Sequence, residues 1–116
     1  MSGLVFFRTT ARERLVEWYT ETVGASVWLE QPGCTILSHG EFRFGFCDAD
    51  ETETEGILTF VYETREAVDE MHERLGAAVR EEPHRNEQYD IYQFFAGDPD
   101  GRTVEIQTFE HELPPL

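Results

Sequence analysis

Residue types that could carry chemistry are scattered along the chain, and they form no compact motif. The four histidines fall in four different contexts: His39 in an expected turn, His72 in an expected helix, His84 in a polar loop and His111 in the C-terminal tail. Histidine serves as a metal ligand or a general base, but both roles require another polar group held beside it. A solvated side chain is therefore the simplest interpretation of each of the four.

Two cysteines offer free thiols, a disulfide or part of a metal site. Cys34 and Cys47 stand in expected strands, with no CxxC spacing and no basic region typical of a secretion signal near the start. Disulfides are rare in reducing compartments, and a buried thiol behaves as a small apolar side chain. The sequence therefore predicts two free, buried thiols in preference to a disulfide or a metal pair.

A run of carboxylates at residues 48–56 could bind a cation loosely. It reads Asp-Ala-Asp-Glu-Thr-Glu-Thr-Glu-Gly and lacks the spaced ligands and central glycine of an EF-hand loop. Because it also lacks apolar side chains that could pack, we predict a solvated linker here.

Length and charge limit the classes of function. The 116 residues suffice for one domain with one core, and an aromatic content of 13% excludes a disordered acidic tail. All nine basic residues are arginine, and 24 acidic residues bring the net charge to −15. Such a surface repels nucleic acid and anionic lipid, so we expect no nucleic-acid partner and no membrane association. The acidic composition is typical of halophilic organisms. Because no apolar run approaches the roughly 18 residues of a membrane span and the start lacks the basic region of a signal peptide, we predict a cytoplasmic protein.

The first half of the chain predicts a strand, a helix and three further strands. Residues 4–9 are rich in β-branched and aromatic side chains. Thr10 and Glu13 fit a capping box at the start of a helix that Gly24 ends. Short strands separated by turns are expected at 26–30, 34–38 and 41–47.

The second half repeats this order. A strand at 57–62 precedes a helix that begins after Thr64 and ends at Gly76. Further strands are expected at 78–82, 89–96 and 102–108, with a polar loop at 83–88 and a turn at 98–101. Gly24-Ala25-Ser26-Val27 and Gly76-Ala77-Ala78-Val79 hold equivalent places, so each half has the order β-α-β-β-β.

One C-terminal motif adds to this duplication: a turn followed by a strand that carries a glutamate, Asp98-Pro99-Asp100-Gly101-Arg102-Thr103-Val104-Glu105-Ile106. Together with Trp18-Tyr19 ahead of Val23-Gly24, it resembles the vicinal oxygen chelate superfamily, which includes glyoxalase I, extradiol dioxygenases and bleomycin-resistance proteins. The resemblance covers nearly the whole chain. It implies an α+β fold in which two βαβββ modules have mixed sheets curled into a cup, with the helices outside.

The resemblance also implies a single domain over residues 1–116. Module one would span about 3–47 and module two about 57–108, joined by the acidic linker 48–56 and followed by a tail at 109–116.

Alternation along each strand decides which side chains enter such a cup. If Glu105 takes the family's inward position, Thr103 and Gln107 also face inward, and the same alignment selects positions on other strands. The implied ligand-binding residues are Arg8, Phe6, Trp28, Thr59, Gln93, Phe95, Glu105 and Gln107.

The metal site of the family is mostly missing from this sequence. Metal-dependent members place His on the first strand, His on the fifth and Glu on the eighth, which correspond to Leu4, Ile57 and Glu105. A single carboxylate cannot hold a transition metal, which takes three or more protein ligands. No histidine shares a strand face with Glu105 in this alignment. We therefore predict no metal site and no cofactor.

Catalytic residues stay unassigned. Glu105 and His84 are weak candidates for proton transfer, and the loop of His84 could hang over the mouth of the cup. Arg8 and Glu105 would each need a partner inside a cup. They form either a structural ion pair or a ligand-binding pair, whereas a register error of one residue would turn both to the opposite face.

Aromatic side chains could stack a planar ligand. The candidates are Trp28 and the alternating residues Phe42, Phe44 and Phe46. Packing within the sheet core is the favoured interpretation.

The leading interpretation is a metal-independent small-molecule binding protein of the bleomycin-resistance type, with a small organic ligand. Family resemblance also implies a homodimer. The alternative is a glyoxalase-like lyase or isomerase, or a dioxygenase, with a rearranged divalent metal site. A third interpretation is an interaction module whose cup is filled by side chains.

Overall fold

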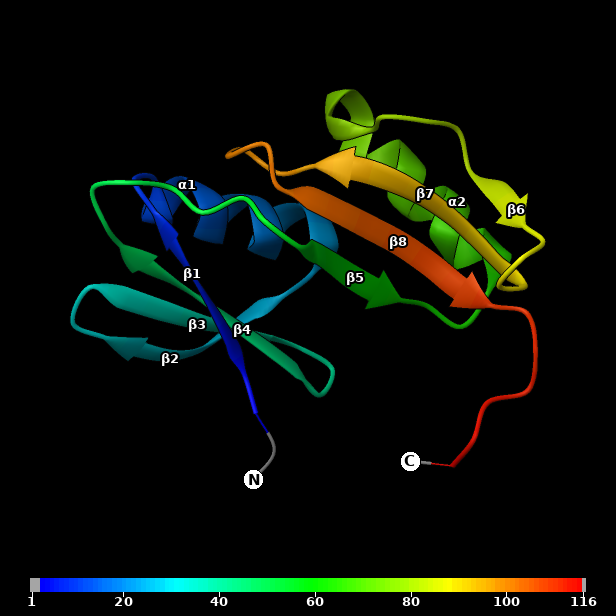
Figure 1. Cartoon of the computed structure of the whole chain (residues 1–116), viewed down its shortest axis with the longest axis horizontal. Coiled ribbons are helices and arrows are strands. Elements are labelled where there is room, and N and C mark those ends of the chain that lie inside the picture. The colour runs from blue at the N-terminus through cyan, green and yellow to red at the C-terminus, as the bar shows by residue number, and fades with distance from the viewer. Residues whose placement is uncertain (1–2, 116) are drawn as a thin grey trace. The chain divides into compact units, whose positions relative to one another are not determined.

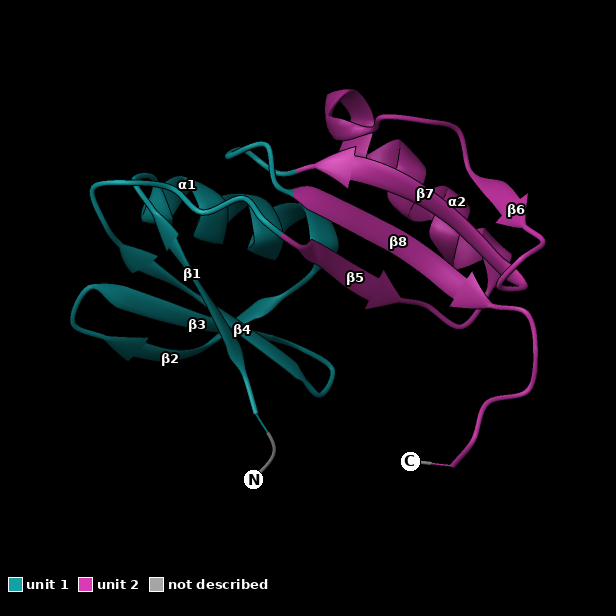
Figure 2. Ribbon diagram, in the orientation of Figure 1, with its two compact units in different colours: residues 1–55, 98–102 teal, residues 56–97, 103–116 magenta. Residues whose placement is uncertain are grey.

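A computed structural model describes residues 3–115 and divides the chain into two compact units (Figures 1 and 2). Unit 1 comprises residues 1–55 and 98–102, and unit 2 comprises residues 56–97 and 103–116. Residues 48–55 of the expected linker and the turn at 98–102 both belong to unit 1, and the interpretation as a single domain stays a prediction. Within residues 3–115, every helix is too short or too polar to cross a membrane.

Unit 1 is a four-stranded sheet with a helix on one face (Figure 1). Its strands are β1 (Val5–Thr9), β2 (Ser26–Gln31), β3 (Cys34–His39) and β4 (Phe42–Asp48). The order is β1-β4-β3-β2, with β1 parallel to β4 and the other pairs antiparallel. Helix α1 (Arg12–Trp18) continues into a π-helical turn (Tyr19–Val23) and ends at Gly24, where a φ of 83° suits glycine.

The start of α1 differs from the predicted capping box. Ala11 takes the cap position without a side-chain hydrogen bond. The hydroxyl of Thr10 lies 3.3 Å from the hydroxyl of Thr52, and the backbone N–H of Thr10 donates to the same oxygen at 3.1 Å. The prediction was wrong because the hydroxyl of Thr10 lies against the hydroxyl of Thr52, 42 residues away in the chain, instead of capping the helix.

The predicted acidic linker is mostly exposed, as expected, but its backbone is tied to β1. The N–H of Ala49 donates to the carbonyl of Thr9 at 3.0 Å, and the N–H of Glu53 donates to the carbonyl of Arg8 at 2.9 Å. These bonds hold the segment along the edge strand of unit 1.

Unit 2 has the same topology, which confirms the internal repeat. Its strands are β5 (Ile57–Val61), β6 (His84–Asn86), β7 (Ile91–Gly97) and β8 (Thr103–Phe109), in the order β5-β8-β7-β6. Helix α2 (Arg65–Leu75) begins at the predicted cap, where the hydroxyl of Thr64 accepts from the N–H of Ala67 at 3.1 Å. The core between helix and sheet is formed by buried side chains: Leu58, Phe60, Val68, Met71, Leu75, Phe94, Val104 and Ile106.

Two boundaries in unit 2 correct the sequence prediction. Residues 78–82 form no strand: a 3-10 turn (Gly76–Ala78) follows α2, and Val79 makes an isolated bridge to Ala96. The strand lies instead in the predicted polar loop, as β6. Pro83 has no N–H to give to a ladder, so regular pairing begins only after it.

The two cysteines also correct the prediction, because Cys34 and Cys47 form a disulfide. They are direct partners in the antiparallel ladder between β3 and β4, with Cα atoms 4.1 Å apart. Such a spacing is that of a pair without mutual backbone hydrogen bonds, where side chains approach closest. Spacing along the sequence could not reveal this register.

The turn at 98–102 forms the most polar part of the unit 1 core. Arg102 is fully buried, and its Nη1 donates to Oδ2 of Asp98 at 2.7 Å. The hydroxyl of Tyr19 donates to the same oxygen at 2.7 Å. The guanidinium also donates to the carbonyl of Glu53 and lies over the ring of Phe7, 4.7 Å from its centroid.

This network fixes the protonation state of Tyr19. Burial raises the pKa of Tyr19 well above its usual value, and the negative charge of Asp98 raises it further. The phenol therefore stays neutral and remains a donor to Asp98.

Candidate functional site

The candidate site lies on the face of the unit 2 sheet that α2 does not cover. Thr59, Gln93, Glu105 and Gln107 define this polar face. Thr59 pairs with Glu105 in the β5–β8 register, and Gln93 pairs with Gln107 in the β7–β8 register. Because register partners point to the same side of a sheet, these four side chains share one face.

Glu105 stands at the centre of the polar face and is only 9% exposed. The hydroxyl of Thr59 donates to its Oε1 at 2.8 Å, and the amide of Gln93 donates to its Oε2. Asn86 in turn donates to Oε1 of Gln93 at 2.8 Å. A buried carboxylate is thus held by uncharged donors, each oriented by a neighbouring strand.

Gln107 is held differently from its neighbours. It is 7% exposed, and its buried Oε1 has no hydrogen-bond partner among the described residues. Most buried polar groups in proteins are paired, so such an acceptor is uncommon. The polar face therefore carries a negative charge and an adjacent unused acceptor.

Apolar side chains border this face. Phe95 is the register partner of Glu105 on β7, and Ile57 and Val61 of β5 are 56% and 47% exposed. A hollow lies beyond Val61 at the end of β5 and β8. It is lined by Val61, Tyr62, Glu63, Thr108, Phe109 and Leu113.

His84 occupies a place that the sequence analysis missed. It lies in β6 opposite Gln93, so it shares the face of Glu105 rather than standing in a loop. Its Nε2 lies 2.9 Å from Oε2 of Glu81. The statement that no histidine shares a strand face with Glu105 was wrong, because the structure places an edge strand where the sequence suggested a polar loop.

The unit 1 candidates lie elsewhere. Arg8 has a side chain 72% exposed, with Nε 3.9 Å from Oε1 of Glu53. Phe6 lies across Gly45, where a Cβ would approach the ring to 2.7 Å. The predicted pair of Arg8 with Glu105 joins residues of different units, and it stays a prediction.

The aromatic candidates divide into two groups. Phe44 and Phe46 are fully buried and contact Tyr19, with ring centroids 5.2 and 5.4 Å from that of Tyr19. They belong to the core, as the favoured interpretation had it. Trp28 is exposed on β2, where the guanidinium of Arg43 lies 4.7 Å from its ring centroid.

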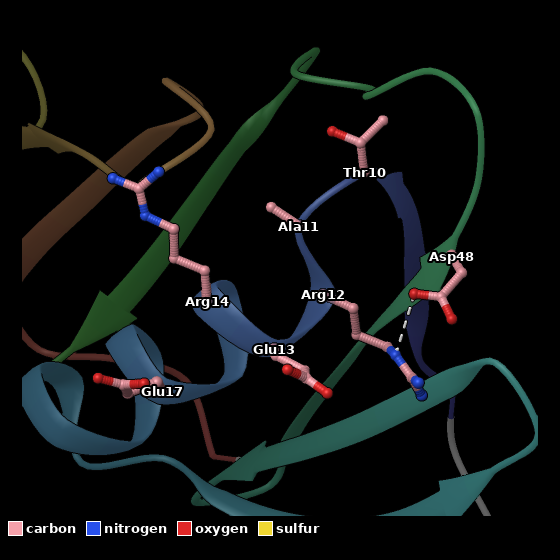
Figure 3. A pocket seen from close by; sticks show the side chains of 7 residues that line it. All are labelled: Thr10, Ala11, Arg12, Glu13, Arg14, Glu17 and Asp48. Atoms are coloured by element: carbon pink, nitrogen blue, oxygen red, sulfur yellow. Dashed lines mark ion pairs between the residues drawn. The ribbon is translucent and has the colours of Figure 1, made fainter.

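A second hollow lies at the start of α1 (Figure 3). It is lined by Thr10, Ala11, Arg12, Glu13, Arg14, Glu17 and Asp48. Arg12 and Asp48 form an ion pair across it, with Nε and Oδ1 3.1 Å apart. Arg12 and Asp48 already pair with each other, and none of the described residues that line this hollow is buried, so it is a weaker candidate for a ligand site than the polar face.

Metal-ligating side chains are dispersed. Over residues 3–115, no three or more His, Cys, Asp or Glu side chains are grouped so that they could hold a metal ion. Glu105 is therefore surrounded by hydroxyl and amide groups rather than by further ligands of the usual kind.

Comparison with solved structures identifies the fold. A glyoxalase/bleomycin resistance protein/dioxygenase from Nocardioides superposes with a TM-score of 0.74 at 17% identity, over 100% of this chain and 89% of that one. A family enzyme of the same description from Burkholderia phytofirmans PsJN gives 0.78 at 20% identity, over 90% and 95%. This chain has the vicinal oxygen chelate fold. A lactoylglutathione lyase from Agrobacterium tumefaciens shares it, with a TM-score of 0.73 at 20% identity over 92% of both chains.

Sequence comparison adds nothing to this fold assignment. No protein-family model matches the chain, and no curated protein does. The fold is thus retained at a sequence identity too low to transfer an activity.

Proposed function

We propose that this protein binds a small organic molecule at the polar face of unit 2, without a metal ion. The observation that carries the proposal is the environment of Glu105. Its two oxygens are held by Thr59 and Gln93, which are uncharged donors rather than metal ligands. Preorganised polar groups bordered by exposed apolar side chains are typical of ligand sites.

The supporting geometry is rigid. Thr59, Gln93 and Glu105 stand on three neighbouring strands, and α2 packs on the opposite side of the same sheet. A site on strands holds its groups more accurately than a site on loops. Ile57, Val61 and Phe95 supply apolar contact area beside the charge.

Ligand binding at this face is tested by nuclear magnetic resonance with a library of small aromatic amidines, amides and acids. We expect binding fragments to shift the amide signals of β5, β7 and β8. Glu105→Gln should weaken binding about tenfold or more, since a hydrogen bond to a charged group contributes roughly 1.5–3 kcal/mol. Glu112→Gln, in the exposed tail, changes the net charge equally and should leave affinity unchanged.

The metal-dependent alternative is tested by a separate measurement. It is favoured by the presence of His84 on the same face as Glu105, and by the fold shared with a lactoylglutathione lyase. Elemental analysis of protein purified without chelator should find less than one transition ion per chain. Stoichiometric Mn, Fe, Ni or Zn would instead assign a rearranged metal site, and a lyase, isomerase or dioxygenase activity with it.

We further propose that the protein is a homodimer. Both edge strands of the unit 1 sheet expose apolar side chains: Leu4, Val5 and Phe6 at β1 and Val27, Trp28 and Leu29 at β2. The β2 edge and the exposed apolar side chains at the start of β1 favour pairing with a second chain, whereas the end of β1 is bonded to residues 49 and 53. Light scattering in molar salt, which screens the net charge of −15, should give twice the 13.5 kDa mass of one chain. The monomer mass across the whole concentration range would refute it.

The small organic ligand, the absence of a nucleic-acid partner and a cytoplasmic location stay predictions of the sequence analysis. The strong negative charge supports the second of these, because it disfavours a polyanionic partner.

A further inference from the structure

A buried acceptor on the polar face, Oε1 of Gln107, has no hydrogen-bond partner among the described residues. The hydroxyl of Thr59 and the amide of Gln93 donate to Glu105, and the amide of Asn86 donates to Gln93. The unused buried capacity is the Oε1 of Gln107 together with the remaining lone pairs of the Glu105 carboxylate. A ligand that donates hydrogen bonds would satisfy these acceptors.

The two ends of the polar face along β8 differ in charge. At the Thr103 end, Nη1 of Arg80 donates to the Thr103 hydroxyl at 2.7 Å. Gly97, the register partner of Thr103, leaves room for this guanidinium, because a Cβ there would lie 2.9 Å from its Nη2. A cation is therefore disfavoured at this end.

The other end of the face is open to a cation. Gln107 lies four residues beyond Thr103, roughly 13 Å along the strand. Because the interaction between charges weakens with distance, the charge of Arg80 disfavours a cation less there than at Thr103. Glu105 is closer, two residues from Gln107 on the same face. The end at Gln107 is thus both negative and rich in acceptors.

Apolar surface adjoins this acceptor end. Val61 is the register partner of Gln107, and it also lines the hollow formed with Phe109 and Leu113. A ring or short hydrocarbon would lie in this hollow while its polar group reaches Gln107.

From these observations we infer that the polar face selects an organic cation that carries N–H donors, such as an amidinium or a primary ammonium attached to an apolar body. The cationic group donates to Oε1 of Gln107 and to Glu105, and the apolar body contacts Val61 and Phe109. This inference rests on the proposed small-molecule binding function and names the ligand class for the same site.

Three probes of one shape test the ligand class by calorimetry. Benzamidine offers donors and a positive charge, benzamide offers one donor group and one acceptor, and benzoate offers acceptors only. We expect benzamidine to bind at least tenfold more tightly than benzamide, and benzoate not to bind. Equal affinity for benzamide or benzoate overturns the inference while leaving small-molecule binding intact. If none of the three binds, the proposed function fails together with the inference.

A pair of variants tests the role of Gln107 at constant net charge. Gln107→Met keeps a long unbranched side chain and removes the acceptor, so benzamidine affinity should fall about tenfold. Gln88→Met makes the same change at an exposed position after β6 and should leave affinity unchanged. Since both variants retain the charge of −15, unspecific attraction of a cation is the same in each. Equal benzamidine affinity in both variants contradicts the inference.

Thermal unfolding of the ligand-free variant supplies an independent reading. Gln107→Met should raise the melting temperature by a few degrees, because it removes a buried acceptor that has no partner. A lower melting temperature would show that this acceptor is satisfied within the folded chain, and it would remove the basis of the inference.

Discussion

Replacement of Arg102 by methionine is expected to lower the free energy of unfolding by about 3–5 kcal/mol, the usual cost of removing one partner of a buried ion pair. Arg102 is fully buried and bonds Asp98, whose side chain is also buried. Methionine fills much of the same volume but donates no hydrogen bond. The variant therefore leaves the Asp98 charge and the Glu53 carbonyl without their guanidinium donor.

The size of this effect is limited by the other donors to Asp98. Its Oδ1 accepts from the N–H groups of Asp100 and Arg102, and its Oδ2 accepts from the hydroxyl of Tyr19. These bonds survive in the variant, so the loss should be near the lower end of the range. Arg102→Met combined with Asp98→Asn should recover part of it, because the Asp98 charge is then removed together with its partner. The recovery is incomplete because Asp100, whose Oδ2 lies 3.7 Å from Nη2 of Arg102, still loses its ion pair.

Urea unfolding followed by circular dichroism measures the change. Arg8→Met is the matched control, since the Arg8 side chain is mostly exposed and its removal should change stability by less than about 0.5 kcal/mol. If Arg102→Met and Arg8→Met unfold at the same urea concentration, Arg102 does not hold the turn of residues 98–102 in the core of unit 1.

Local patterns in the sequence were sufficient for most elements. Alternating and β-branched runs located β1, β3, β4, β5, β7 and β8 to within a residue or two. Thr64 and Gly76 marked the ends of α2 because their effects are local: a hydroxyl that meets an amide three residues on, and a positive φ. The duplicated order of these elements then gave the fold.

Two predictions from local patterns failed, for different reasons. Thr10 matched a capping box by spacing, but its hydroxyl meets Thr52. Residues 78–82 matched a strand by analogy with the first half, yet only Val79 forms a bridge. For Thr10 the competing contact lies far away in the sequence, beyond the reach of a local pattern. For residues 78–82 regular pairing begins only after Pro83, which has no N–H for a ladder.

The candidate site shows the same division. Alternation on β8 correctly implied that Glu105 and Gln107 share a face, since the period of a strand is fixed by its backbone. The partners of Glu105 and the unpaired oxygen of Gln107 depend on the register of three strands. The burial of Arg102 carried a usable signal, a lone arginine directly after a tight Asp-Gly turn, but spacing alone could not show which unit encloses it.

Reduction of the Cys34–Cys47 disulfide should lower the free energy of unfolding by about 3 kcal/mol. The bridge joins residues 13 apart in the chain, and closing a loop of this length in the unfolded state accounts for a stabilisation of that size. The free-thiol prediction rested on the rarity of disulfides in reducing compartments, whereas the β3–β4 register places the two sulfurs in direct opposition.

Thermal unfolding with and without dithiothreitol measures this contribution, and Cys34→Ala combined with Cys47→Ala is the control. Wild-type protein should melt at a lower temperature after reduction. The double variant should melt near the temperature of the reduced wild type, and dithiothreitol should not change its melting temperature. A thiol titration of unreduced, denatured protein should find less than one free thiol per chain. Two titratable thiols would restore the original prediction and would agree with a cytoplasmic location, because that compartment is reducing. The ladder between β3 and β4 would then keep its register without a covalent bridge.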